Sequence, residues 1–189
     1  IVFVIIVLKV TGIDYDTYDK RANVLSYLLT PSTVCLAIPL YQQMNLLKKN
    51  LKAIIAGITT GVFASLAGVW VFSMLFHLKK QFYVTLLPKS ITTAIGMGIS
   101  EELGGIVTIT VAVIIITGVL GNMIAEVVYK IAKIEEPIAR GLGLGTSAHA
   151  IGTAKAMELG PVEGAMSSLA IAVAGLLTVV GASVFAGMM

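Results

Sequence analysis

The chain has 189 residues, of which 57% are hydrophobic and 12% are charged, with a net charge of +3 and a mean hydropathy of +0.97. Because about a quarter of the residues in soluble domains are charged, this composition excludes an ordinary soluble protein and predicts an integral membrane protein. The single cysteine, Cys35, excludes an internal disulfide.

The first part of the chain alternates between apolar and polar segments. An apolar run ends at Lys9, and an acidic segment at residues 14–19 follows, which we expect in water or among lipid headgroups. The charge-free stretch 22–47 contains prolines and hydroxyls, so we predict a discontinuous helix there. Its candidate pathway or coupling residues are Pro31, Ser32 and Thr33.

Three later runs contain no charged residue and are long enough to cross a bilayer as helices. They cover residues 53–78, 103–125 and 164–189, and a helix of about 20 residues spans the hydrocarbon core. Two shorter charge-free runs, 90–100 and 141–154, count 11 and 14 residues. They are long enough for about half a bilayer, so we predict half-helices or re-entrant segments.

A short motif recurs where apolar sequence is interrupted. Ala37-Ile38-Pro39, Ala94-Ile95-Gly96 and Ala150-Ile151-Gly152 begin 57 and 56 residues apart, and residues 94–104 share six of eleven identities with residues 150–160. This pattern predicts internal repeats. Within a single membrane domain, 1–189, the repeat units are roughly 22–78, 79–129 and 130–189.

The relative orientation of these units depends on how the interrupted segments cross the bilayer. If each enters and leaves on one side, successive units are inverted; if each crosses fully, they are parallel. The shortness of the polar segments favours inversion. Since lipid does not solvate free backbone amides, interrupted segments must line a space that the protein encloses. We therefore predict a polytopic, all-α helical bundle with a transport pathway.

Two interrupted segments place a cation before hydroxyls and small residues, at 88–96 and 140–153. A half-helix that begins inside the membrane offers unpaired N–H groups and a positive dipole end, which favour a carboxylate. Alternatively, the hydroxyls bond only to carbonyls of their own helix, and the glycines only permit close packing. The predicted substrate-binding residues are Lys89, Ser90, Thr92, Thr93, Thr146, Ser147, His149 and Thr153.

Three further polar residues lie within apolar sequence. His149 titrates near neutral pH and is a candidate for substrate contact or proton coupling; the alternative is a neutral histidine bonded between helices. Asn122 either joins helices or touches the pathway, and we expect Glu126 to pair with Lys130 at helical spacing. No second ligand accompanies His149, so we predict no metal site.

Enzymatic motifs are missing from the sequence. Neither a nucleophile elbow, a zinc-protease helix motif nor a phosphate loop is present, so we predict that the chain is not an enzyme. We also predict no cofactor apart from a coupling ion, a proton or sodium. Nucleic acid is not an expected partner. Gly57 and Gly61 provide a close-packing face for a homodimer.

The segments 88–93 and 141–154 closely resemble the LrgB/CidB family, and Glu163-Gly164-Ala165 also fits. The resemblance covers nearly the whole chain from Tyr15 onward. It implies a multi-pass protein of the bacterial cytoplasmic (inner) membrane, truncated here at its N-terminus. It also implies a holin-like membrane partner of the LrgA/CidA type.

Two functions attach to the resembled family. One is antiholin-like regulation of murein hydrolase export and autolysis; the other is transport of small monocarboxylates. The resemblance implies glycolate and glycerate for the plastid relatives and pyruvate for some bacterial ones. The residues favour an alternating-access carrier, because half-helix ends, hydroxyls, a cation and one histidine suit a compact anion.

Overall fold

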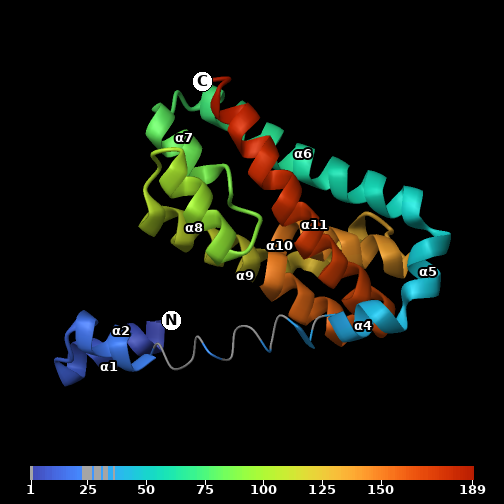
Figure 1. Ribbon diagram of the computed structural model, residues 1–189, viewed down its shortest axis with the longest axis horizontal. Helices are drawn as coiled ribbons and strands as arrows, with labels where there is room; N and C mark the ends of the chain where they lie inside the picture. The colour runs from blue at the N-terminus through green and yellow to red at the C-terminus, as the bar shows by residue number, and fades with distance from the viewer. Residues whose placement is uncertain (1, 23–26, 28–30, 32–33, 36) are drawn as a thin grey trace. The chain divides into compact units, whose positions relative to one another are not determined.

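The computed structural model describes all residues except 1, 23–26, 28–30, 32–33 and 36 (Figure 1). In the described part, every regular element is a helix, as the sequence predicts. These residues form two compact units, 1–37 and 38–189. Of the candidate pathway residues in the first unit, Ser32 and Thr33 fall outside the described residues, and Pro31 is exposed.

The first unit contains α1 (Val2–Thr11) and α2 (Tyr15–Ala22). Asp14 begins α2 because its Oδ2 accepts a hydrogen bond from the Thr17 backbone N–H at 3.0 Å. Hydrogen bonds from Thr17 hold the pKa of the Asp14 carboxyl below its usual value. Residues 15–19 of the acidic segment 14–19 therefore belong to α2.

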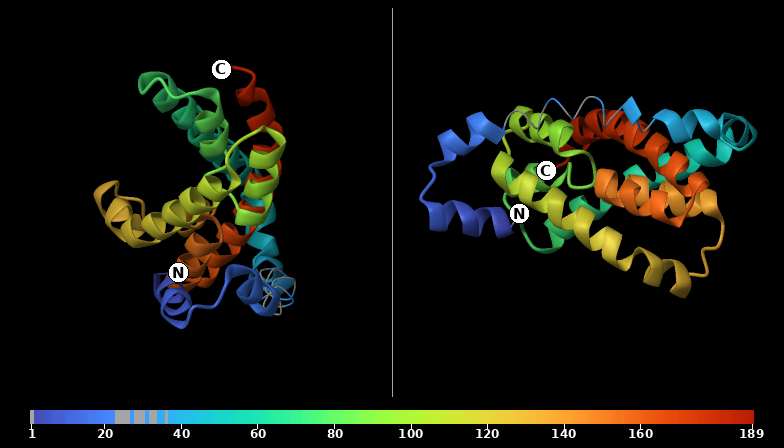
Figure 2. Two further views of the ribbon diagram at one scale, coloured as in Figure 1. Left: turned by 90° about the vertical axis from the view of Figure 1, so that its left-hand side faces the viewer. Right: turned by 90° about the horizontal axis from the view of Figure 1, so that it is seen from below.

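The second unit packs its helices around α10, which contacts α11 most extensively and then α9 and α6 (Figures 1 and 2). The C-terminal part of α11 packs against the middle of α6, where Gly181 approaches Leu66. The helices of this unit are α4 (Ala37–Gln42), α5 (Met44–Lys49), α6 (Leu51–Leu75), α7 (Lys80–Leu86), α8 (Thr93–Glu102), α9 (Val107–Ile131), α10 (Pro137–Leu159) and α11 (Pro161–Ala186).

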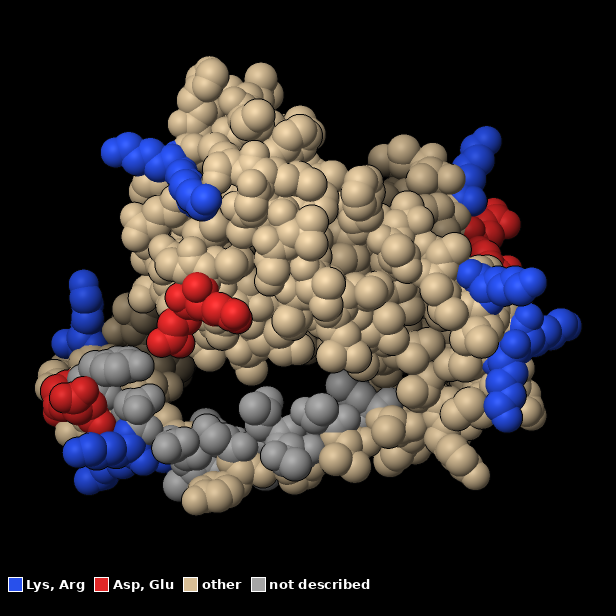
Figure 3. Space-filling model, turned by 45° about the horizontal axis from the view of Figure 1, so that its top comes forward, with Lys and Arg blue, Asp and Glu red and all other residues tan. Residues whose placement is uncertain are grey.

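Three of these helices, α6, α9 and α11, are long and apolar enough to cross a membrane. They contain 25, 25 and 26 residues and coincide closely with the three runs predicted from the sequence. Large apolar side chains remain exposed along them, including Phe72, Ile116 and Val180. Apart from the first unit, charged side chains lie toward the ends of the face in Figure 3 and leave a broad uncharged area between them. Such a surface suits lipid, not water.

Several helix ends are closed by a residue with positive φ. His77 after α6, Gly104 after α8 and Lys133 after α9 have φ values of 49°, 76° and 53°. In each case the next residue's N–H bonds the carbonyl five residues earlier, at 2.7 to 2.9 Å. This is the Schellman arrangement, which satisfies carbonyls left unpaired at a helix end and turns the chain toward the next helix.

Helical geometry is interrupted within both of the predicted polar segments, 88–96 and 140–153. Between α7 and α8 the chain passes Pro88 and reaches an extended Thr92 (φ −62°, ψ 144°) before α8 begins. Within α10, His149 is not helical (φ 44°, ψ −134°). The first residue of α8, Thr93, and His149 are 56 residues apart, the spacing of the predicted repeat. The repeat, its inversion and a re-entrant path stay predictions.

Candidate functional site

The two predicted segments, 88–96 and 140–153, both contact α6, one turn apart. The Ser65 hydroxyl of α6 is 3.1 Å from that of Ser90, in the linker between α7 and α8. One turn earlier, a Cβ atom on Gly61 would lie 2.9 Å from Thr146 Oγ1 of α10. Because residues four apart on a helix are surface neighbours, α6 brings the two predicted segments close together.

The two predicted segments also meet at Ile114, a fully buried residue of α9. His149 Nε2 is 2.9 Å from the Ile114 carbonyl oxygen, and because a carbonyl only accepts, the imidazole N–H donates. On the other segment, a Cβ atom on Gly96 of α8 would collide with the Ile114 side chain. Thus α9 and α6 both contact the two segments.

His149 combines burial with an unusual backbone conformation. Its exposed fraction is 4%, and its φ of 44° with ψ of −134° costs about 1 to 3 kcal/mol for a residue with a side chain. The ring fits because α9 has a glycine opposite it: a Cβ atom on Gly118 would lie 2.7 Å from Nε2. His149 therefore joins α10 to α9, as the alternative hypothesis of an interhelical histidine expects. Its roles in substrate contact and proton coupling stay predictions.

Lys89 is a half-buried cation in the first interruption. Its Nζ donates a hydrogen bond to Ser90 Oγ at 2.8 Å. Among the described residues, ion pairs join Lys155 to Glu126 and Glu158, and none involves Lys89. A partly buried ammonium without a counter-ion carries a desolvation cost that an anion would offset.

Thr92 and Thr93 form the start of α8, and both are half-buried. Thr92 stands in the N-cap position, but its side chain makes no capping hydrogen bond. The first intrahelical bond runs from the Gly96 N–H to the Thr92 carbonyl at 2.9 Å. The earlier N–H groups of α8 therefore receive no cap from Thr92.

The three hydroxyl residues of α10 each bond to a carbonyl of their own helix. Thr146 donates to Leu142 at 2.8 Å, Ser147 to Gly143 at 2.6 Å, and Thr153 to His149 at 3.1 Å. Thr146 and Thr153 are buried, whereas Ser147 is exposed. Thr146 therefore contacts α6 one turn from Ser90, the residue of the first interruption that also contacts α6. Ser147 is not brought to this region.

Thr153 makes a second contact that links α10 to α11. Its Oγ1 is 2.7 Å from Ser167 Oγ, and Ser167 has no exposed surface. Because the single hydroxyl hydrogen of Thr153 bonds His149 O, Ser167 is the donor. Ser65 and Ser167 are not among the site residues predicted from the sequence. The signal that could have found them is a hydroxyl inside a charge-free membrane span, where it needs a hydrogen-bond partner.

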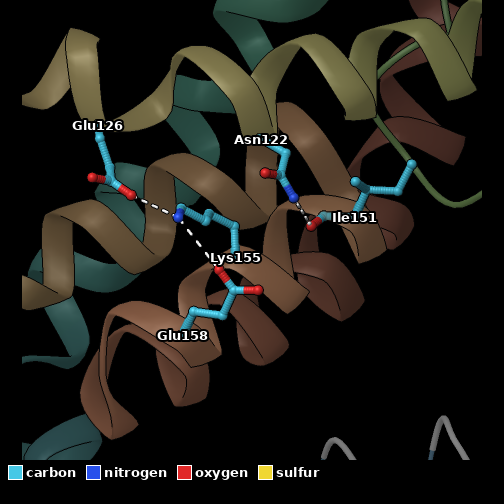
Figure 4. Close-up of polar contacts among 5 residues, drawn as sticks. All are labelled: Asn122, Glu126, Ile151, Lys155 and Glu158. Carbon is cyan, nitrogen blue, oxygen red and sulfur yellow. Dashed lines mark hydrogen bonds and ion pairs between the residues drawn. The ribbon is translucent and has the colours of Figure 1, made fainter.

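The seam between α9 and α10 corrects one prediction (Figure 4). Glu126 pairs with Lys155 of α10 at 2.6 Å, not with Lys130 of its own helix. Lys155 also reaches Glu158 at 3.3 Å. One turn before Glu126, Asn122 Nδ2 donates to the Ile151 carbonyl at 3.3 Å. Asn122 therefore joins helices, and its pathway role stays a prediction.

Gly57 and Gly61 do provide a close-packing face, but within the chain. A Cβ atom on Gly57 would lie 3.1 Å from Leu142 Cδ1, and Gly61 faces Thr146. A groove of about 450 Å³ runs along this contact between α6 and α10, from Asn50 to Thr146. α10 thus occupies the face that we expected a second copy to use.

Metal-ligating side chains are dispersed. In the part of the chain that the structure describes, no three His, Cys, Asp or Glu residues are grouped so that they could hold a metal ion. Glu163, which begins α11, is buried (7% exposed) beside Gly160. It is a single carboxylate, so it does not form a metal site.

Helices with an apolar surface, packed around buried polar interruptions, define an all-α integral membrane protein. A scan against protein families matches residues 1–188 to the LrgB-like family. Two holin-like CidB proteins from two Staphylococcus epidermidis strains are each 41% identical over 175 residues, which cover 93% of this chain and 76% of theirs. No solved structure matches significantly.

The chain therefore belongs to the LrgB-like family. This membership confirms the resemblance predicted from the segments 88–93 and 141–154. The relatives are named holin-like proteins.

Proposed function

We propose that this protein carries small monocarboxylates of the pyruvate, glycolate and glycerate type across the bacterial cytoplasmic membrane by alternating access. The observation that carries the proposal is the convergence of the two predicted segments on α6: Ser90 meets Ser65, and Thr146, three residues before the break at His149, meets Gly61 one turn away. Two broken segments side by side at the centre of a bundle can surround one small solute.

The charges and donors of this region suit a carboxylate. Lys89 supplies a half-buried cation without an acidic partner among the described residues. The uncapped start of α8 at Thr92 supplies backbone N–H groups and a positive dipole end. Lys89 and Thr92 lie three residues apart in the same linker, and one anion contacts the cation and the helix terminus together.

The groove between α6 and α10 supports a route to this region. It extends from Asn50 and Glu136 to Thr146, which lies beside the interruptions. During transport the interrupted segments move against the continuous helices α6, α9 and α11. His149, at the hinge of α10, couples the movement to a proton or, alternatively, sodium enters with the substrate.

The test is uptake into liposomes that contain the purified protein, measured with labelled pyruvate, glycolate and glycerate. We expect Ser90→Ala, Thr92→Ala and His149→Ala to lower the initial rate by about tenfold or more, because a hydrogen bond to a charged group contributes about 1.5 to 3 kcal/mol. Ser183→Ala is the matched control: this exposed hydroxyl bonds only its own helix, at Val179 O, and uptake should not change.

A second function is favoured by the names of the relatives, which are holin-like proteins. In this alternative the chain is an antiholin-like regulator of murein hydrolase export and autolysis. It acts through a holin-type membrane partner of the LrgA/CidA kind. Absence of uptake both with and without that partner, or uptake that none of the three substitutions alters, would support the regulator over the carrier.

A further inference from the structure

A polar pocket of about 380 Å³ lies where α9 ends and α10 begins. It is separate from the interruptions and has no part in the proposed transport cycle. Its charged and aromatic lining consists of Glu126, Tyr129, Lys130, Lys133, Glu135 and Arg140. We propose that this pocket binds the phosphate group of an anionic phospholipid.

Arg140 is held in position by contacts that leave the end of its side chain for a ligand. Its Nε donates to the Ile134 carbonyl at 2.8 Å, and its guanidinium carbon lies 5.8 Å from the centre of the Tyr129 ring. The Tyr129 hydroxyl donates to Arg140 O at 2.8 Å. Among the described residues no carboxylate lies within 4.0 Å of the guanidinium. A fixed, unpaired guanidinium fork matches the oxygens of a phosphate.

The charge of the pocket favours an anion. Lys130 and Lys133 are exposed and line the pocket with Arg140. Of the two acids, Glu126 is already paired with Lys155 at 2.6 Å. Among the residues that line the pocket, Glu135 is therefore the acid outside the described ion pairs, against three cations.

The surroundings favour a lipid over a free anion. The pocket lies at the C-terminal end of α9, a candidate membrane span that ends at Ile131. Ile131 is 78% exposed and Val127 is 57% exposed, so apolar surface for acyl chains adjoins the cations. Basic pockets at the ends of membrane helices recognise anionic headgroups in this way.

The test is native mass spectrometry of the purified protein in mixed micelles of phosphatidylglycerol and phosphatidylcholine. We expect selective retention of phosphatidylglycerol. Lys133→Gln should weaken its apparent affinity about fivefold, since each basic residue near an anionic surface contributes about 1 kcal/mol. Arg140→Gln should weaken it further. Lys52→Gln, which removes an exposed lysine of α6 outside the pocket, is the control and should have no effect.

Three results would overturn the proposal. The first is equal retention of both lipids, and the second is retention that the lysine and arginine substitutions leave unchanged. The third is displacement of the lipid by excess inorganic phosphate, which would indicate a soluble anion as the ligand. Because Arg140 also holds the turn at Ile134, its variant can fail to fold. The double variant Lys130→Gln, Lys133→Gln changes only exposed side chains and decides the outcome in that case.

Discussion

The two interruptions reach the same region of the bundle by different physical means. Between α7 and α8 the chain uses Pro88, which lacks an N–H, and six linker residues that end in an extended Thr92. α10 changes direction at one residue, His149, in a conformation that side chains rarely adopt. The first break is built into the local sequence, whereas the second requires the surrounding helices to hold it.

Hydrogen bonds from other helices support both breaks. Behind the first break, Thr110 Oγ1 donates to Thr85 O at 2.9 Å and lies 2.7 Å from Ser100 Oγ, and all three residues are at most 1% exposed. At the second break, α9 contributes the Ile114 carbonyl and α11 contributes Ser167. Both breaks thus depend on α9, but the break in α10 also depends on α11 and contains the strained residue, so we expect it to respond more to changes in neighbouring helices.

The largest effect is expected from filling the space opposite His149. Gly118→Leu would place its Cβ atom 2.7 Å from the imidazole and 2.8 Å from Ile151 Cδ1, so we expect a loss of about 3 kcal/mol or failure to fold. The measurement is the melting temperature of the protein in detergent. Gly68→Leu is the matched control, because a Cβ atom there meets nothing within 4 Å. Equal melting of both variants would mean that α9 and α10 do not approach as described.

Glycine and alanine at position 149 separate backbone strain from side-chain loss. Both remove the hydrogen bond to Ile114 O, but only glycine tolerates the backbone conformation of His149 without strain. We expect His149→Gly to be more stable than His149→Ala by about 1 to 2 kcal/mol, measured as a difference in melting temperature. At Thr92, where φ is −62°, the glycine variant should not be more stable than the alanine variant. A higher melting temperature for Thr92→Gly than for Thr92→Ala would remove the contrast between the breaks.

Adjacent serines of α11 test the interhelical support of the second break. Ser167 bonds Thr153 of α10, whereas Ser168 bonds Gly164 O of its own helix at 2.8 Å. We expect Ser167→Ala to lower the free energy of unfolding by about 1 kcal/mol and Ser168→Ala to lower it less. Thermal melting in detergent measures both. If Ser168→Ala costs as much as Ser167→Ala, the cross-helix bond has no special importance.

The smallest effect is expected at the solvent-accessible end of the α9–α10 seam. Glu126→Gln removes the ion pair with Lys155, but the Glu126 side chain is 61% exposed. Exposed ion pairs contribute little and are screened by salt. We expect a slight fall in melting temperature at low salt that disappears at high salt. A large fall that persists at high salt would show that this pair holds α10 as firmly as the His149 contact does.

Much of the fold could be predicted because lipid imposes strong rules on sequence. The three charge-free runs became α6, α9 and α11 with ends shifted by a few residues. Polar sequence at 88–96 overlaps the linker before α8, and polar sequence at 140–153 contains the break at His149, since backbone polarity in a membrane needs an internal partner. The half-helices or re-entrant segments predicted there stay predictions.

Partners across helices could not be predicted in the same way. Glu126 has Lys130 at helical spacing, yet it pairs with Lys155 on another helix. Gly57 and Gly61 have the spacing of a dimer motif, yet they receive Leu142 and Thr146 of the same chain. Spacing along one helix defines its faces, but it does not say which helix covers each face.

The sequence by itself determined the membrane class, the long helices and the break near Pro88, because these follow from local hydrophobicity and proline, whereas the position of the break at His149 depends on the neighbouring helices. Only the tertiary structure decided that Ser90 meets Ser65, that Thr146 meets Gly61 and that His149 bonds Ile114 O. Those contacts join residues far apart in the chain, and they depend on how close two helices can approach. Small residues at both surfaces permit that approach.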